Sequence, residues 1–130
     1  MAVIDASVLV DYLAGGADQA AIRQRLYAER LLWAPHLVDA EVGHALRRGV
    51  ANGAIRQSAA RAALEDLADL PIRRTGHLAL MRRAWELRAN VSFYDALYVA
   101  LAERLDEPLV TLDGRLAGAA GVRAEIEVIA

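Results

Sequence analysis

Residues 2–10 read AVIDASVLV, a short apolar run that stops at an acid and then resumes. A short run without polar residues is typical of a strand buried on both faces. We therefore expect a strand over residues 2–5 and a helix over residues 7–13. Asp5 stands where the chain enters its core, so it either caps the helix that follows or belongs to a functional site.

The rest of the chain alternates strands with helices in the same way. We expect further strands at residues 31–34, 71–73, 109–112 and 126–129, and helices at residues 17–30, 36–51, 55–69, 76–89, 93–105 and 114–119. This alternation predicts a parallel sheet covered by helices on both faces. The expected fold class is α/β, a single three-layer domain over residues 1–130 with a central parallel sheet of four to five short strands.

Composition excludes several kinds of site. The chain has no cysteine, which excludes disulfides, thiolate metal sites and cysteine nucleophiles. All 15 basic residues are arginine, which excludes Schiff-base chemistry and Walker-A loops. The net charge is −2, so nucleic-acid binding would need a local cluster of positive charge. Since neither a membrane span nor a signal peptide is evident, we expect a cytoplasmic protein with no membrane partner.

Two of the expected strands run directly into an acid. Asp5 follows the first strand, and Asp113 follows the apolar run at residues 109–112. Ligands of parallel sheets bind beyond the carboxyl ends of the strands, so both acids are candidates for a site. A structural role remains open for each, because aspartate also caps helices and makes turns.

Two further acids lie on expected helices. Ser92 and Asp95 fit a capping box, yet the helix they begin is apolar almost all round and therefore buried. Glu41 falls inside the apolar arc of its helix, between Leu37 and Ala45, where an unpaired charge is rare. Two carboxylates about 4 Å apart repel by roughly 4 kcal/mol at an effective dielectric of 20. A cluster of these acids would therefore favour a hard divalent cation, Mg²⁺ or Mn²⁺.

The segments around the four acids resemble those of PIN-domain ribonucleases, specifically the VapC toxins of VapBC toxin–antitoxin pairs. They are VIDASVLVDYL at residues 3–13, APHLVDAEVGHALRR at 34–48, SFYDALYVALAE at 92–103 and LVTLDGRLA at 109–117. Each motif alone is weak, but four in the same order and spacing are specific. The resemblance covers essentially the whole chain and implies a PIN-like fold.

The resemblance also implies an activity, Mg²⁺- or Mn²⁺-dependent cleavage of RNA. It makes Asp5 and Asp95 the most direct metal ligands. Asp113 would complete the metal cluster, and Glu41 would bind through water or orient the attacking water. A metal-activated water would attack phosphorus and leave a 5′-phosphate and a 3′-hydroxyl.

Supporting residues and partners follow from the same resemblance. Ser7 and Thr111 are similar to small hydroxyl residues that stand beside the acids, with capping or strand-end hydrogen bonds as the alternative. The expected partners are RNA, a second copy in a homodimer, and a small VapB-like antitoxin that buries part of itself in the acidic cleft. The competing hypothesis is a non-catalytic or housekeeping PIN-like module that binds or processes RNA.

Other polar and aromatic residues have less specific signals. The histidines show no acid–base arrangement, so His36, His44 and His77 are expected to be structural or solvated. The arginine pairs at residues 47–48, 73–74 and 82–83 are candidates for RNA phosphate contacts, although such pairs are more often solvated.

Two tyrosines on the helix of Asp95 also have two interpretations. Tyr94 and Tyr98 are candidates for stacking on a base, but packing in the core is the favoured interpretation.

Overall fold

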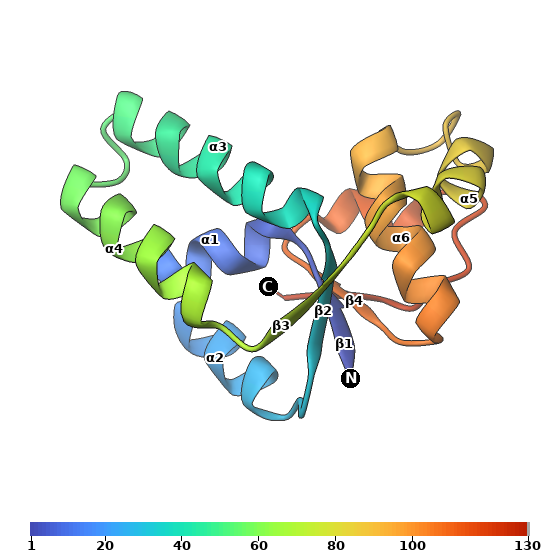
Figure 1. Cartoon of the computed structure of the whole chain (residues 1–130), viewed down its shortest axis with the longest axis horizontal. Helices are drawn as coiled ribbons and strands as arrows, with labels where there is room; N and C mark the ends of the chain where they lie inside the picture. Colours follow the sequence, from blue (N-terminus) through green and yellow to red (C-terminus); the bar gives the residue numbers. More distant parts are fainter. Residues whose placement is uncertain (130) are drawn as a thin grey trace.

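The computed structural model describes residues 1–129 and has one five-stranded sheet at its centre (Figure 1). The strand order is β3-β2-β1-β4-β5, and every neighbouring pair is parallel. The strands are β1 (Ala2–Ile4), β2 (Leu32–Pro35), β3 (Ile72–Thr75), β4 (Leu109–Thr111) and β5 (Ile126–Val128). The expected α/β class with a parallel sheet is confirmed.

Helices cover both faces of this sheet. The helices on one side are α1 (Ala6–Ala14), α2 (Gln19–Tyr27), α3 (Leu37–Ala51) and α4 (Gln57–Asp69), and those on the other are α5 (Met81–Glu86) and α6 (Phe93–Leu105) (Figure 1). Two short 3₁₀ helices, η1 (Leu78–Leu80) and η2 (Gly114–Gly118), precede α5 and follow β4. Within residues 1–129, no helix is long and apolar enough to cross a membrane.

The core is built around β1, the central strand of the sheet, and its neighbour β4. The side chains of β1 and β4 are fully buried, and α6 is buried without interruption from Ala96 to Ala102. The chain leaves β1 toward β2 on one side and later crosses to β4 on the other. The carboxyl ends of β1 and β4 therefore lie side by side where the direction of winding reverses, which is the usual ligand position in such sheets.

The expected helix at residues 76–89 is wrong in its extent. Only α5 and the preceding η1 are helical there, because backbone bonds with three-residue spacing occur before α5 and after Leu87. The Leu80 N–H donates to the His77 carbonyl, the Arg88 N–H to the Trp85 carbonyl and the Asn90 N–H to the Leu87 carbonyl. The strand expected at residues 71–73 begins one residue later, since Pro71 has no N–H to donate to a neighbouring strand.

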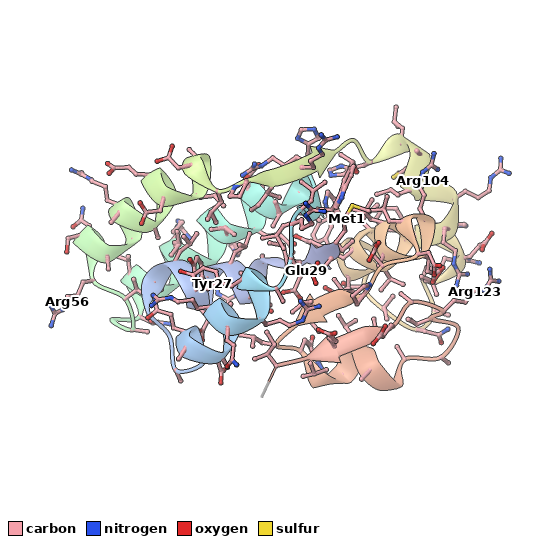
Figure 2. The ribbon with its side chains drawn as sticks, turned by 90° about the horizontal axis from the view of Figure 1, so that it is seen from below. Met1, Tyr27, Glu29, Arg56, Arg104 and Arg123 are labelled. Atoms are coloured by element: carbon pink, nitrogen blue, oxygen red, sulfur yellow. The ribbon has the colours of Figure 1, made fainter. Side chains whose placement is uncertain are left out.

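Ion pairs hold the outer elements to this frame. At the amino side of the sheet, Arg25 on α2 contacts Glu29 at 2.6 Å and Glu127 on β5 at 2.5 Å. Figure 2 shows Glu29 from below, close to Met1. At the opposite edge strand, β3, Arg74 donates two hydrogen bonds to Asp39, at 2.7 and 2.9 Å. The Arg74 pair fixes the first turn of α3, the helix that carries Glu41.

Gly49 on α3 allows the following loop to pack directly on the helix. A Cβ at this position would lie 2.4 Å from Ile55 Cδ1, whereas a Cβ at Gly43 meets nothing within 4 Å in the described chain. We expect Gly49→Ala to lower the free energy of unfolding by about 1 kcal/mol, because overpacking outweighs the gain in helix propensity. Gly43→Ala should raise it by about 0.5–1 kcal/mol. Urea denaturation measures the free energy of unfolding of both variants. An equal increase in Gly49→Ala and Gly43→Ala would contradict the tight contact between Gly49 and Ile55.

Candidate active site at the carboxyl edge of the sheet

Asp5 follows β1 and lies at the centre of the candidate site. Its side chain is only 8% exposed. Oδ1 accepts hydrogen bonds from the Ser7 hydroxyl at 2.6 Å and from the Val8 N–H at 3.2 Å, and Oδ2 accepts from the Thr111 hydroxyl at 2.5 Å. The Val8 bond makes Asp5 the N-cap of α1, so the strand ends at Ile4 and the capping role is real.

Ser7 and Thr111 connect this carboxylate to the end of β4. The Ser7 hydroxyl accepts from the Leu112 N–H at 3.1 Å, and the Thr111 hydroxyl accepts from the Asp113 N–H at 2.9 Å. Each hydroxyl therefore accepts a hydrogen bond from the backbone just after β4 and donates its own O–H to Asp5. Both residues expected to support the acids contact Asp5 directly.

Glu41 reaches the same edge from α3. Its Oε1 accepts a hydrogen bond from the Tyr98 hydroxyl of α6 at 2.6 Å. Burial raises the pKa of the Glu41 carboxyl, the Tyr98 bond lowers it in part, and the charges of Asp95 and Asp5 raise it further. The Tyr98 hydroxyl keeps its proton, because burial and the bond to Glu41 raise its pKa far above the usual value.

Asp95 lies in the first turn of α6, with its carboxylate available. The Ser92 hydroxyl accepts a hydrogen bond from the Asp95 N–H at 3.1 Å, which caps the helix. Across residues 1–129, the carboxylate itself accepts no hydrogen bond in return, so only half of the expected capping box forms. Its charge raises the pKa of Asp5, for which burial is the largest cause.

Asp113 takes a different role from the other acids. Its Oδ1 accepts from the Arg115 N–H at 3.0 Å, and the Arg115 guanidinium forms two more bonds to the carboxylate, at 3.0 and 2.9 Å. These hydrogen bonds lower the pKa of Asp113. Asp113 thus caps η2 and is neutralised by an arginine that is 90% exposed.

The structure brings three of the four predicted acids into mutual electrostatic contact. Asp5, Glu41 and Asp95 interact with one another through their charges, whereas the charge of Asp113 is taken up by Arg115. No three His, Cys, Asp or Glu side chains in the described part of the chain are spaced as a ready metal-binding cluster. The donors are nevertheless carboxylate oxygens under mutual repulsion, and this chemistry suits Mg²⁺ or Mn²⁺.

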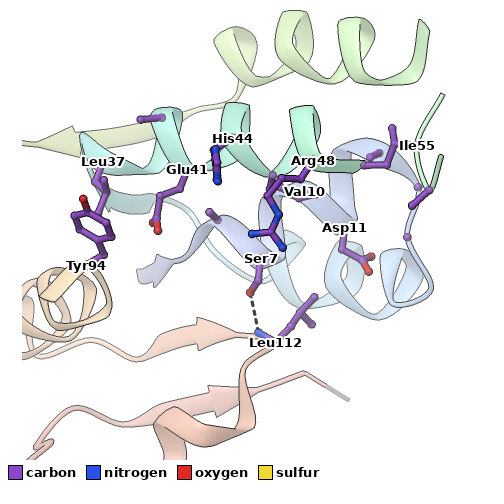
Figure 3. Close-up of a pocket in the computed structure, with 17 residues that line it drawn as sticks. Ser7, Val10, Asp11, Leu37, Glu41, His44, Arg48, Ile55, Tyr94 and Leu112 are labelled. Carbon is purple, nitrogen blue, oxygen red and sulfur yellow. Dashed lines mark hydrogen bonds between the residues drawn. The ribbon is translucent and has the colours of Figure 1, made fainter. Parts of the chain in front are cut away.

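A groove of about 740 Å³ lies between α1 and α3, and Glu41 is the candidate acid that lines it. Figure 3 shows Ser7, Val10 and Asp11 on one wall and Leu37, Glu41, His44 and Arg48 on the other. Tyr94 lies at the end near Glu41, Leu112 lies beside Ser7, and Ile55 lies at the far end (Figure 3). We call this cavity the α1–α3 groove.

The aromatic predictions for α6 are half right. Tyr98 is buried as expected, but its hydroxyl also contacts Glu41, a contact that the sequence does not reveal. The three-residue spacing of Tyr98 from Asp95 is the available signal, since it puts both on one helix face. Tyr94 was expected in the core, and that is wrong: its side chain is 61% exposed, because it lies on the opposite side of the first turn, beside the groove.

Removing the charge of Glu41 should stabilise the protein in EDTA. A raised folded-state pKa means that the native protein binds more protons than the unfolded chain, so stability is lost as pH rises above about 4.3 through the folded-state pKa. In Glu41→Gln, the amide oxygen can still accept the hydrogen bond from Tyr98, but the side chain does not ionise, so the variant does not lose stability as pH rises. We expect the variant to be more stable than wild type near about pH 8 and equal to it below about pH 4.

Urea denaturation at several pH values measures this difference. Glu65→Gln, on the exposed face of α4, is the matched control and should show no such pH-dependent gain. A less stable Glu41→Gln protein near neutral pH would mean that the ionised carboxylate stabilises the fold.

Comparisons with known proteins identify the family of this chain. The PIN domain family matches residues 2–122. Ribonuclease VapC1 of Mycobacterium tuberculosis is 51% identical over 128 residues, which cover 98% of this chain and 96% of that protein. VapC ribonuclease Mb0985 of Mycobacterium bovis is 41% identical over 129 residues, which cover 99% of this chain and 98% of that protein.

A solved structure has a similar fold. VapBC-5 from Mycobacterium tuberculosis, a member of the VapBC family of toxin–antitoxin systems, superposes with a TM-score of 0.61 at 26% identity. The match covers 98% of this chain and 97% of that one. The chain is therefore a member of the PIN-domain family, in its VapC group.

Proposed function

We propose that this protein is a metal-dependent endoribonuclease, the toxin of a toxin–antitoxin pair, which hydrolyses RNA phosphodiester bonds in the cytoplasm. The observation that carries the proposal is the Asp5 carboxylate, held by three donors at the carboxyl edge of the sheet beside Glu41 and Asp95. The ribonuclease names of the VapC relatives support RNA as the substrate.

We propose that Asp5, Asp95 and Asp113 hold Mg²⁺ or Mn²⁺. When bound, such an ion supplies an activated water and neutralises charge on the phosphate. Asp5 is oriented in advance, because its hydrogen bonds fix both carboxylate oxygens. Asp113 has to release Arg115 to serve as a ligand, and the released guanidinium is then available for the phosphate charge.

Glu41 is suited to positioning water or accepting its proton. The Tyr98 hydroxyl occupies Oε1 and leaves the second carboxylate oxygen available. The pKa of Glu41 is raised toward neutral pH, and a carboxylate is a more effective base when its pKa is closer to the working pH. Tyr98 acts through Glu41 and is a positioning residue.

Protein partners are also part of the proposal. We propose a small VapB-like antitoxin as the physiological inhibitor, supported by the likeness to a VapBC toxin–antitoxin structure. We also propose a homodimer. The exposed apolar side chains of Leu78, Met81 and Trp85, on one side of η1 and α5, are a suitable surface for a second copy.

Loss of a carboxylate should abolish RNA cleavage and spare the fold. We expect Asp5→Asn and Asp95→Asn to lower the rate of RNA cleavage in Mn²⁺ by about 100-fold or more, because each removes a proposed ligand. Asp66→Asn, an exposed acid on α4, should cleave like wild type. Circular dichroism of each variant shows whether the fold is retained.

The ends of the cleaved RNA separate the mechanisms. Hydrolysis by water leaves 5′-phosphate and 3′-hydroxyl ends, which sequencing of the fragments after brief incubation identifies. Cyclic 2′,3′-phosphate ends, or full activity in excess EDTA, would contradict the metal-dependent mechanism. A folded protein that binds RNA but cleaves none with Mg²⁺ or Mn²⁺ would favour the non-catalytic module.

A further inference from the structure

We propose that Arg48 binds a backbone phosphate of single-stranded RNA in the α1–α3 groove. The proposal rests on the ribonuclease function proposed above, and it adds the path of the strand and a residue that holds it. In this proposal, the part of the groove between Tyr94 and Arg48 holds the nucleotides on one side of the cleaved bond.

The first support is the spacing of polar residues along α3. Glu41, His44 and Arg48 are three and four residues apart, and that spacing places them on one face of the helix. Figure 3 shows all three side chains extending from α3 into the groove. Seven residues of helix separate Glu41 from Arg48 by about 10 Å along the axis. Nucleotides stacked in a helix are about 3.4 Å apart along the axis and those of an extended strand are farther apart, so this distance corresponds to at most about three nucleotides.

The second support is that the charge of Arg48 is not used by the fold. Arg74 pairs with Asp39, and Arg83 pairs with Glu103. By contrast, Arg48 makes no ion pair or side-chain hydrogen bond within residues 1–129 and is exposed. A guanidinium without a protein partner, in a groove that leads to the proposed cleavage centre, complements a polyanion.

An acid on the opposite wall does not cancel this charge. Asp11 Oδ2 accepts a hydrogen bond from the Asp18 N–H at 3.4 Å and lies against Gly16, where a Cβ would come within 2.2 Å. Its Oδ1 is buried and has no hydrogen-bond partner among the described residues. The carboxylate of Asp11 is therefore directed at the turn after α1 and not at Arg48.

The third support is the lining between the acids and Arg48. It consists mainly of small apolar side chains, among them Ala6, Val10, Ala14, Ala40 and Ala45. Such a surface leaves room for ribose and base faces, and Tyr94 at the acidic end offers an exposed ring for stacking. An aromatic platform combined with a cation is the usual arrangement for binding a single strand.

Salt-dependent binding tests the role of Arg48. The probe is a fluorescein-labelled random-sequence RNA of about twelve nucleotides, titrated by anisotropy against full-length protein carrying Asp95→Asn to prevent turnover. In this background we expect Arg48→Ala to weaken binding several-fold. It should also reduce the slope of log affinity against log salt by about 0.7, the value for one phosphate contact to a single strand. Arg47→Ala, the neighbouring exposed arginine outside the groove, should change neither.

A second pair of variants tests the stacking end. Tyr94→Ala should weaken binding by about fivefold or more without changing the salt slope, whereas Tyr94→Phe keeps the ring and should bind like the parent protein. A loss in Tyr94→Ala that is accompanied by a changed slope would contradict stacking.

Two outcomes overturn the proposal in distinguishable ways. If the wild-type protein cleaves RNA but Arg48→Ala behaves like Arg47→Ala, the path along the groove is wrong and the ribonuclease function stands. If Arg48→Ala weakens only the binding of an antitoxin protein, the groove is a protein-binding surface. A wild-type protein that neither binds nor cleaves RNA would remove both proposals.

Discussion

The hydrogen bonds that converge on the Asp5 carboxylate join the sheet, α1 and the candidate site. The hydroxyls of Ser7 and Thr111 each accept a hydrogen bond from a backbone N–H just after β4 and donate one to Asp5. The same carboxylate caps α1 through the Val8 N–H. A buried charge is costly unless hydrogen bonds satisfy it, and here three donors do so. The neighbouring strands β1 and β4 are thereby joined at the point where ligands of such sheets bind.

The remaining acids differ in how their charge is balanced. Glu41 has a neutral donor, the Tyr98 hydroxyl, and its charge remains under repulsion from Asp5 and Asp95. Asp113 instead has a cation, Arg115, which lowers its pKa. The carboxyl edge of the sheet therefore combines acids that have no cation partner with one acid, Asp113, whose partner Arg115 is exposed and can leave it for another partner. This combination suits a site that has to accept both a cation and a phosphate.

Much of this arrangement could be predicted from the sequence, because it depends on local patterns. Strands that end in acids, and Glu41 inside an apolar arc, are visible in short windows. Sequence reasoning also set capping against a site role for Asp5, but the structure shows that capping and membership of the acidic group are compatible.

The features that the sequence could not predict depend on long-range contacts. The Thr111 bond to Asp5 spans 106 residues, and the Tyr98 bond to Glu41 spans 57. The exposure of Tyr94 depends on which face of α6 packs on the sheet, and a helix that is apolar almost all round does not specify this.

Thermal unfolding with and without Mn²⁺ tests the proposed cation site most directly, because it requires no knowledge of the RNA target. Binding to the native state alone stabilises it by about 2.7 kcal/mol when the free ion is at roughly 100 times its Kd. The wild-type Tm should therefore rise with Mn²⁺ concentration, and Asp5→Asn and Asp95→Asn should lose most of this rise while Asp66→Asn retains it. A wild-type Tm that does not respond to Mn²⁺, or an equal rise in all four proteins, would contradict a cation site at the carboxyl edge of the sheet.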